Sequence, residues 1–173
     1  MKGTIHKSIE KLVIEKFGID KWNECLASVG LDEDHVFMIN DDIDEKLTMD
    51  LLGKMPGVLG ITFAQVCDAF GEYWVNAYVP KVYFGYIENY KSAKEFLLGM
   101  DTIHQTVTKE VPNAHPPRFD YEQKGENTLL MTYKSDRGLV DLFISLVKGV
   151  GIYYKQELKV TKHSEKLVEI QFM

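Results

Sequence analysis

Cysteine and arginine are both scarce in this chain, and each shortage narrows the possible functions. Among 173 residues the only cysteines are Cys25 and Cys67, and they lie far apart in the sequence. Neither a disulfide framework nor a C-x-x-C metal site is therefore indicated, and we expect two buried, reduced thiols. Of the twenty basic residues only Arg118 and Arg137 are arginines. Each arginine is thus a candidate for a specific bidentate contact with a carboxylate or a phosphate.

Long apolar runs and an excess of positive charge are also missing. No uninterrupted apolar stretch approaches the ~18 residues that a membrane span needs, and no basic-then-apolar leader opens the chain. These features predict a cytoplasmic protein. The formal net charge of −6 argues against nucleic-acid binding but leaves a basic protein partner possible. With 45% hydrophobic and 27% charged residues, we expect one compact domain over residues 1–173.

Hydrophobic periodicity divides the chain into a helical part and a later sheet. Apolar residues at spacings of three and four predict helices at 5–13, 21–28, 45–54, 63–78 and 89–111, with Gly18, Gly30 and Pro56-Gly57 as stops. Alternating patterns predict strands at 118–123, 127–137, 157–162 and 166–172, with a helix inserted at 138–154. The predicted class is α+β, in which the helical N-terminal two thirds pack on a C-terminal antiparallel sheet.

One histidine lies in the middle of an apolar helix face. Leu97, Met100, His104 and Val107 recur at spacings of three and four in the last predicted helix before the sheet. A histidine in such a place is ordinarily a hydrogen-bonded core residue. Neutral imidazole is also the usual axial ligand of five-coordinate heme iron, which needs an apolar surround that excludes water. Periodicity alone leaves both interpretations open.

Three hydrogen-bond donors alternate near the end of the second predicted strand. Tyr133, Ser135 and Arg137 occupy every other position, so their side chains are expected on one face. Two hydroxyls and a forked guanidinium suit an anion with several oxygens, such as the propionates of heme. The competing interpretation is a half-exposed strand that carries a surface arginine.

The whole chain resembles the heme-nitric oxide/oxygen-binding family, H-NOX, which also provides the sensor of soluble guanylate cyclase. The likeness rests on Met1-Lys2-Gly3, the stretch 69–74, Met100-Asp101 ahead of His104, Pro116-Pro117 and the Tyr-x-Ser-x-Arg motif at 133–137. It implies a b-type heme between the helical part and the sheet, with His104 as proximal iron ligand. It also implies that Tyr133, Ser135 and Arg137 hold the propionates and that Pro117 packs against the porphyrin. Such a protein is a sensor and not an enzyme.

The resemblance also bears on which gas is bound. Oxygen-stabilising relatives place a tyrosine hydroxyl over the distal side of the heme, and the corresponding position here is Leu142. Bound dioxygen needs a donor, whereas NO and CO bind in an apolar pocket. We expect Ile5 and Leu146 to complete an apolar distal wall, with Ile9 nearby, and we predict a site that binds NO and CO but little oxygen.

Two aromatic residues keep an oxygen-binding alternative open. Trp74 carries an indole N–H and Tyr78 a phenol, and either would make this an oxygen sensor if it reached the bound gas. The competing interpretation is ordinary core packing. The two further alternatives are a heme enzyme, which would need distal acid–base groups that are not apparent, and a heme-free module for a small ligand.

The resemblance implies a signalling mechanism and a class of partner. NO is expected to weaken the bond between iron and His104, which releases the helix and lets the helical part shift relative to the sheet. The output is expected in a separate protein or on a longer chain: a histidine kinase, a cyclic-dinucleotide enzyme or a chemotaxis receptor. No structural metal is expected, and the remaining histidines, His6, His35, His115 and His163, are predicted at the surface.

Overall fold

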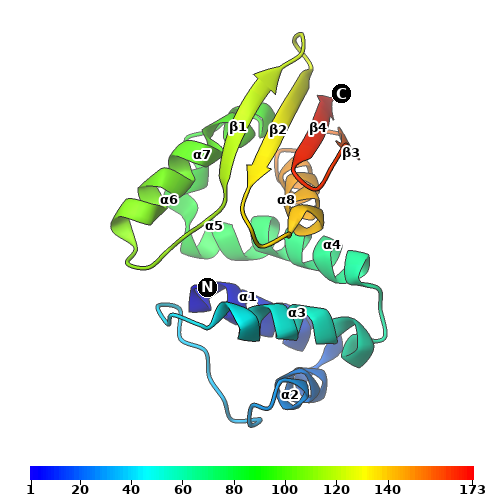
Figure 1. The fold of residues 1–173 in the computed structure, drawn as a ribbon. Helices are drawn as coiled ribbons and strands as arrows, with labels where there is room; N and C mark the ends of the chain where they lie inside the picture. Colours follow the sequence, from blue (N-terminus) through cyan, green and yellow to red (C-terminus); the bar gives the residue numbers. More distant parts are fainter. The chain divides into compact units, whose positions relative to one another are not determined.

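The computed structural model describes all 173 residues, which form two compact units, Met1–Ala69 and Phe70–Met173 (Figure 1). The predicted α+β class is confirmed, because helices occupy the chain up to Glu110 and a four-stranded antiparallel sheet follows. Each unit is described by itself, and a single domain over residues 1–173 stays a prediction. No helix is both long and apolar enough to cross a membrane.

The first unit is built on the helices α1 (Gly3–Phe17), α2 (Ile19–Ser28) and α3 (Glu45–Leu59). The predicted stop at Gly18 is confirmed, because this residue has a φ of 92° and its amide donates to the carbonyl of Ile14 over 3.1 Å. The predicted stop at Pro56 is wrong. A proline loses its own helical donor but tolerates helical φ and ψ, so α3 continues to Gly60, whose left-handed conformation ends it.

His6 is not at the surface as predicted. Its side chain is 0% exposed because His6, Ile9 and Val13 share the buried face of α1. The Nε2 atom of His6 lies 3.1 Å from the Thr48 hydroxyl, and its ring lies 4.7 Å from that of Phe37. Burial lowers the pKa of His6 to about 4, so this imidazole is neutral at neutral pH. The other three histidines outside the predicted site are exposed, as expected.

The long predicted helix at 63–78 is interrupted by a π-helix. Helix α4 (Phe63–Tyr73) is followed by η1 (Trp74–Tyr78), α5 (Val79–Val82) and α6 (Phe84–Ile87). The amide of Val79 donates to the carbonyl of Trp74, five residues earlier. Pro80 explains the widening, because it offers no amide hydrogen and its ring would crowd the carbonyl four residues back. The Asn76 amide donates to the carbonyls of Glu72 over 3.0 Å and Gly149 over 3.1 Å, which fixes the widened turn.

Helix α7 (Ala93–Glu110) begins four residues later than predicted. Ser92 sets the start, because its hydroxyl accepts from the amide of Glu95 over 3.1 Å. The Glu95 carboxylate accepts in return from the amide of Lys91 over 2.9 Å. This reciprocal capping defines the first turn of the helix that carries His104.

The sheet has the strand order β1-β2-β4-β3 and is antiparallel throughout. Its strands are β1 (Arg118–Gln123), β2 (Thr128–Lys134), β3 (Leu158–Lys162) and β4 (Leu167–Phe172). The predicted strand at 127–137 extends beyond the end of β2 at Lys134. The chain turns at Asp136-Arg137 before the positive φ of Gly138, so Ser135 and Arg137 follow the strand and do not extend its face.

Helix α8 (Val140–Tyr153) lies between β2 and β3 in the sequence and packs on η1 and β3. Its approach to the end of α4 depends on two glycines. A Cβ atom at Gly149 would lie 2.4 Å from the carbonyl oxygen of Gly71, and one at Gly71 would lie 2.4 Å from the backbone of Ser145. The backbones of the two helices are therefore in direct contact.

Candidate functional site

His104 projects from α7 onto the segment that leads into β1. Its Nδ1 atom lies 2.6 Å from the carbonyl oxygen of Pro117. A carbonyl only accepts hydrogen bonds, so Nδ1 carries the proton and donates it. The lone pair is then on Nε2, which is the arrangement of a histidine that is ready to bind a metal.

The surroundings of His104 keep this imidazole neutral. Burial lowers the pKa of His104 below its usual range, while the contact with Pro117 and the charge of Asp101 oppose that shift. No group of three or more His, Cys, Asp or Glu side chains is arranged to hold a metal ion. His104 is thus a candidate for the single protein ligand of a metal whose other ligands come from elsewhere.

Apolar side chains lie on the helix that carries His104 and on the strand next to it. Leu97 is buried and Met100 is half-buried on the same helix. The ring of Phe119 lies 5.6 Å from the imidazole. Since Phe119 pairs with Tyr133 across β1 and β2, the sheet register places Tyr133 in the same cluster.

Tyr133 is buried between two phenylalanines. Its ring lies 6.1 Å from that of Phe119 and 5.7 Å from that of Phe143, which is nearly parallel to it. The residue is only 3% exposed. Its phenol hydroxyl is a donor from which a ligand oxygen could accept a hydrogen bond.

Arg137 reaches the same short segment that receives His104, and Ser135 bonds to Arg137. The Nη1 atom of Arg137 donates to the carbonyl of His115 over 2.7 Å. The Ser135 hydroxyl accepts from the amide of Arg137 over 3.4 Å. His104 and Arg137 therefore both bind the stretch 115–117, which includes the half-buried Pro117.

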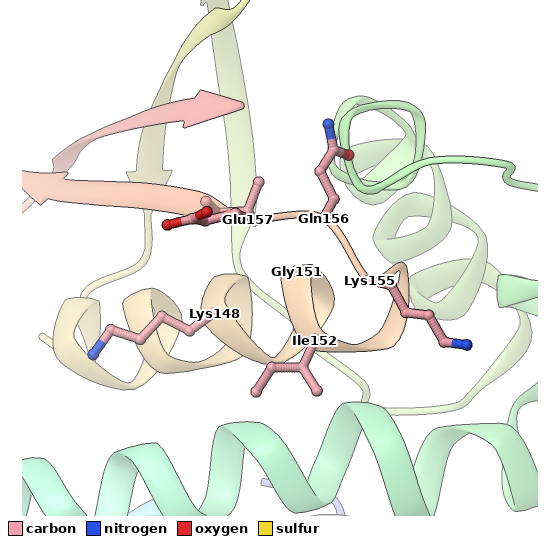
Figure 2. A pocket seen from close by; sticks show the side chains of 7 residues that line it. Lys148, Gly151, Ile152, Lys155, Gln156 and Glu157 are labelled. Atoms are coloured by element: carbon pink, nitrogen blue, oxygen red, sulfur yellow. The ribbon is translucent and has the colours of Figure 1, made fainter. Parts of the chain in front are cut away.

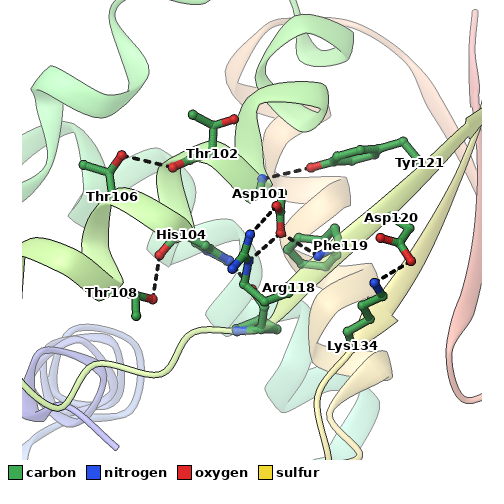
Figure 3. A network of polar contacts seen from close by, with 11 residues as sticks. Asp101, Thr102, His104, Thr106, Thr108, Arg118, Phe119, Asp120, Tyr121 and Lys134 are labelled. Carbon is green, nitrogen blue, oxygen red and sulfur yellow. Dashed lines mark hydrogen bonds and ion pairs between the residues drawn. The ribbon is translucent and has the colours of Figure 1, made fainter.

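An ion pair next to His104 was not foreseen as a pair from the sequence. Figure 3 shows Asp101 on α7 and Arg118 at the start of β1 in a bidentate contact, with Nε to Oδ1 at 2.7 Å and Nη2 to Oδ2 at 2.6 Å. The amide of Phe119 also donates to Oδ1 of Asp101 over 2.8 Å. The bond with Arg118 lowers the pKa of Asp101 to about 2. The scarcity of arginine signalled Arg118, but nothing local identified its partner.

The predicted distal residues lie on three helices. Trp74 and Tyr78 stack on each other within η1, with ring centroids 5.2 Å apart. Leu142 and Leu146 are half-buried one turn apart on α8. Ile5 is half-buried on α1 in the other unit, where Ile9 is buried. The stacking of Trp74 on Tyr78 accords with core packing, although Trp74 is only half-buried.

Two surface hollows lie outside this set of residues. One, of about 390 Å³, is formed where α8 turns into β3 (Figure 2). It is lined by Lys148, Gly151, Ile152, Lys155, Gln156, Glu157 and Leu158. The other, of about 500 Å³, lies along α2 and the loop after it. Neither is lined by a predicted site residue.

Comparison with known proteins gives a consistent result. The family described as Haem-NO-binding matches residues 2–162. A soluble guanylate cyclase of Caenorhabditis elegans, gcy-34, is 29% identical over 158 residues, which are 87% of this chain and 23% of the cyclase. The chain thus spans about a quarter of the length of this curated relative.

Solved structures share the fold along the entire chain. An oxygen-binding H-NOX domain related to soluble guanylate cyclases, in its oxygen complex, is 26% identical with a TM-score of 0.82, covering 99% of this chain and 95% of that one. An H-NOX protein from S. oneidensis in the Fe(II)NO state has a TM-score of 0.89 at 20% identity, covering 100% and 99%.

Proposed function

This chain belongs to the Haem-NO-binding family and is a heme-binding gas-sensor domain, and we propose that the gas it senses is nitric oxide. The resemblance to H-NOX is confirmed by this match. The single observation that carries the assignment of the site is the contact of His104 with Pro117, which leaves Nε2 available for iron.

We propose that the cofactor is heme b with His104 as its proximal ligand. When bound, ferrous heme held by His104 would supply an iron that binds a diatomic gas. The residues present fit this group: the imidazole is neutral, and Leu97 and Met100 provide an apolar surround. Heme iron needs one protein nitrogen, and His104 offers it.

The propionates are assigned to Tyr133, Ser135 and Arg137. The burial of Tyr133 beside Phe119 and the position of Arg137 at the stretch 115–117 support this assignment. Burying two carboxylates is costly unless donors of this kind pair with them. Pro117, whose carbonyl orients His104, is the residue proposed to contact the porphyrin itself.

The preference for NO and CO over oxygen rests on Leu142. This side chain offers no donor, and its neighbour Leu146 is also apolar. Dioxygen bound to ferrous iron is stabilised by a hydrogen bond, whereas NO requires none.

An oxygen sensor is the second candidate, and one observation favours it. Trp74 is only half-buried and carries an indole N–H, and Tyr78 stacks on that ring. If either reaches the gas, it would take the place of the missing tyrosine. A Trp74→Phe variant separates the two candidates, because only an oxygen sensor would lose a stable oxygen complex.

The output is proposed to act through another protein or another region of a longer chain. The C. elegans relative is a guanylate cyclase of which this chain matches 23%. We propose a histidine kinase, a cyclic-dinucleotide enzyme or a chemotaxis receptor as the effector, in the cytoplasm. Release of His104 on NO addition would remove one constraint on α7, and this change in α7 is the proposed signal.

The test is the absorption spectrum of the anaerobically reduced protein, followed by additions of NO and of air. We expect a five-coordinate ferrous species, loss of histidine coordination with NO, and no stable oxygen complex. His104→Gly should lose the ferrous species and regain it with added imidazole. Absence of bound heme would refute the assignment, and a long-lived oxygen complex would favour the second candidate.

A further inference from the structure

We propose that Asp101 and Arg118 form a positioning pair that fixes the Pro117 carbonyl against His104 and so sets how firmly His104 binds iron. The inference rests on the proposed heme function and adds two residues to it. Neither residue is proposed to touch the heme.

Three consecutive residues join the start of β1 to α7 (Figure 3). The Pro117 carbonyl accepts from His104, the Arg118 side chain binds Asp101 twice, and the Phe119 amide donates to the same carboxylate. Asp101 and His104 are three residues apart, so they lie on one side of the helix. The Pro117 carbonyl orients the imidazole. The next residue, Arg118, is bound to α7 by two hydrogen bonds to Asp101.

The carboxylate of Asp101 is well placed to hold this geometry. It accepts three hydrogen bonds, two of them from a guanidinium whose fork fixes direction as well as distance. The backbone amide of Asp101 donates in turn to the Tyr121 hydroxyl over 2.9 Å, which adds a second attachment to β1. A displacement of β1 along α7 would have to break several of these bonds together.

A carbonyl that accepts a hydrogen bond from Nδ1 changes how strongly Nε2 binds a metal. A close acceptor raises the basicity of the imidazole and fixes its orientation, and loss of such outer contacts typically weakens metal binding about 10–100-fold. When the pair is weakened, the carbonyl of Pro117 loses its support and the short contact with His104 lengthens. The bond from Nε2 to iron then weakens, and NO releases His104 more readily.

The test compares Asp101→Asn and Arg118→Lys with a matched control, Asp120→Asn. Asp120 on β1 forms an ion pair of 2.6 Å with Lys134 on β2, and both side chains are exposed, so this pair joins two strands and not a strand to α7. Arg118→Lys keeps the charge and removes the fork, so it tests geometry with little risk to folding. Heme content and the ferrous spectrum of each protein are recorded first.

Two measurements test the positioning role of Asp101 and Arg118. In the heme-loaded proteins we expect a lower iron–histidine stretching frequency, and about tenfold faster loss of histidine coordination with NO, in both pair variants but not in Asp120→Asn. In the heme-free proteins we expect faster hydrogen exchange at the Phe119 amide with unchanged helix content. The double variant should show no more than the larger single effect, because both changes remove one interaction.

The outcomes separate this inference from the proposed function. If the pair variants bind heme but match the control in stretching frequency and NO rate, the positioning role is refuted while the heme sensor stands. If the unaltered chain takes up no heme, the proposed function fails and the inference fails with it. Should Asp101→Asn not fold, Arg118→Lys gives the same decision.

Discussion

At the scale of single residues, an apolar side chain can determine which gas binds, because it donates no hydrogen bond to the ligand. Leu142 offers no hydrogen bond at the position that we propose to face the bound gas. A donor next to partly charged dioxygen contributes about 1.5–3 kcal/mol, whereas NO gains little from it. The selectivity of the site is therefore expected to change with one substitution.

Leu142→Tyr should create an oxygen-binding form. A phenol at this position would slow oxygen dissociation from the ferrous protein by roughly 10–100-fold, as expected for a donor to a partly charged acceptor. Stopped-flow dissociation of oxygen measures this rate. Leu142→Phe supplies the ring without the hydroxyl and should behave like the unaltered chain. Equal oxygen retention in both variants would show that ring size, and not the donor, matters.

His6 should make the first unit sensitive to mild acid. Burial lowers its pKa to about 4 from 6.5, so between these values the unfolded chain binds a proton that the folded chain does not. Stability therefore falls as pH drops from about 6.5 towards 4, by up to about 3 kcal/mol. Urea unfolding at pH 7 and pH 4.5 measures the loss.

A pair of histidine variants tests this assignment. His6→Leu should flatten the pH dependence over that interval, because no buried imidazole remains to be protonated. His115→Gln is the control, since His115 is exposed. A dependence that persists in His6→Leu would assign the acid sensitivity to other groups.

Sequence reasoning identified single residues better than their partners. His104 stands out by its apolar surroundings, and Arg118 by the scarcity of arginine. The contact with Asp101 crosses seventeen positions and depends on how α7 meets β1, which no local pattern records. His6 was misplaced because proximity to the N-terminus does not show which face of α1 is buried.

At the scale of elements, α8 and the end of α4 meet without side chains between them. Gly71 and Gly149 allow this approach, and Asn76 in η1 bonds to the Gly149 carbonyl. Trp74 follows the end of α4 as the first residue of η1, and Leu142 lies on α8. Their mutual position therefore depends on the glycines.

Gly149→Ala should destabilise the protein by about 1–3 kcal/mol. The added Cβ would lie 2.4 Å from a backbone oxygen that cannot move alone. Gly53→Ala is the matched control: Gly53 is exposed in α3 with nothing within 4 Å, so alanine should stabilise that helix by about 0.5–1 kcal/mol. Chemical unfolding measures both. If Gly149→Ala left the free energy of unfolding unchanged, the two helices would be able to separate easily.

Element boundaries followed from the sequence where they depend on local chemistry. The bounds of β1 were predicted correctly, and Gly18 was correctly taken as a stop. The π-helix was missed because apolar periodicity continues through 74–78, although Pro80 marks the place where a regular helix is disturbed. The end of β2 was misjudged because alternation persists into a turn.

At the scale of the whole molecule, the chain is a sensor domain that spans about a quarter of the length of its cyclase relative. A cofactor that binds only the folded chain stabilises it by mass action, by about 4 kcal/mol at a thousandfold excess over its dissociation constant. Heme should thus determine a large part of the stability of this protein, which has two compact units and no disulfide.

Heme addition should raise the melting temperature by roughly 10 °C, given 2–4 °C for each kcal/mol in a chain of this size. The shift should be much smaller in His104→Gly, which lacks the proposed iron ligand. Thermal unfolding of both proteins with and without heme measures this. The heme-free melting temperatures serve as the control, and an equal shift in the two proteins would place the principal ligand elsewhere.

The three successive attachments at 117–119 also determine where the chain tolerates a change of length. In an extended segment the side chains alternate, so one residue inserted between Pro117 and Phe119 would turn the following groups to the opposite side. Pro112 and Asn113, in the loop before it, are exposed and Asn113 already has a positive φ, so extra residues at this point would leave the attachments in phase. We therefore expect the protein to tolerate a peptide inserted at Asn113, but not an insertion or deletion within the next six residues.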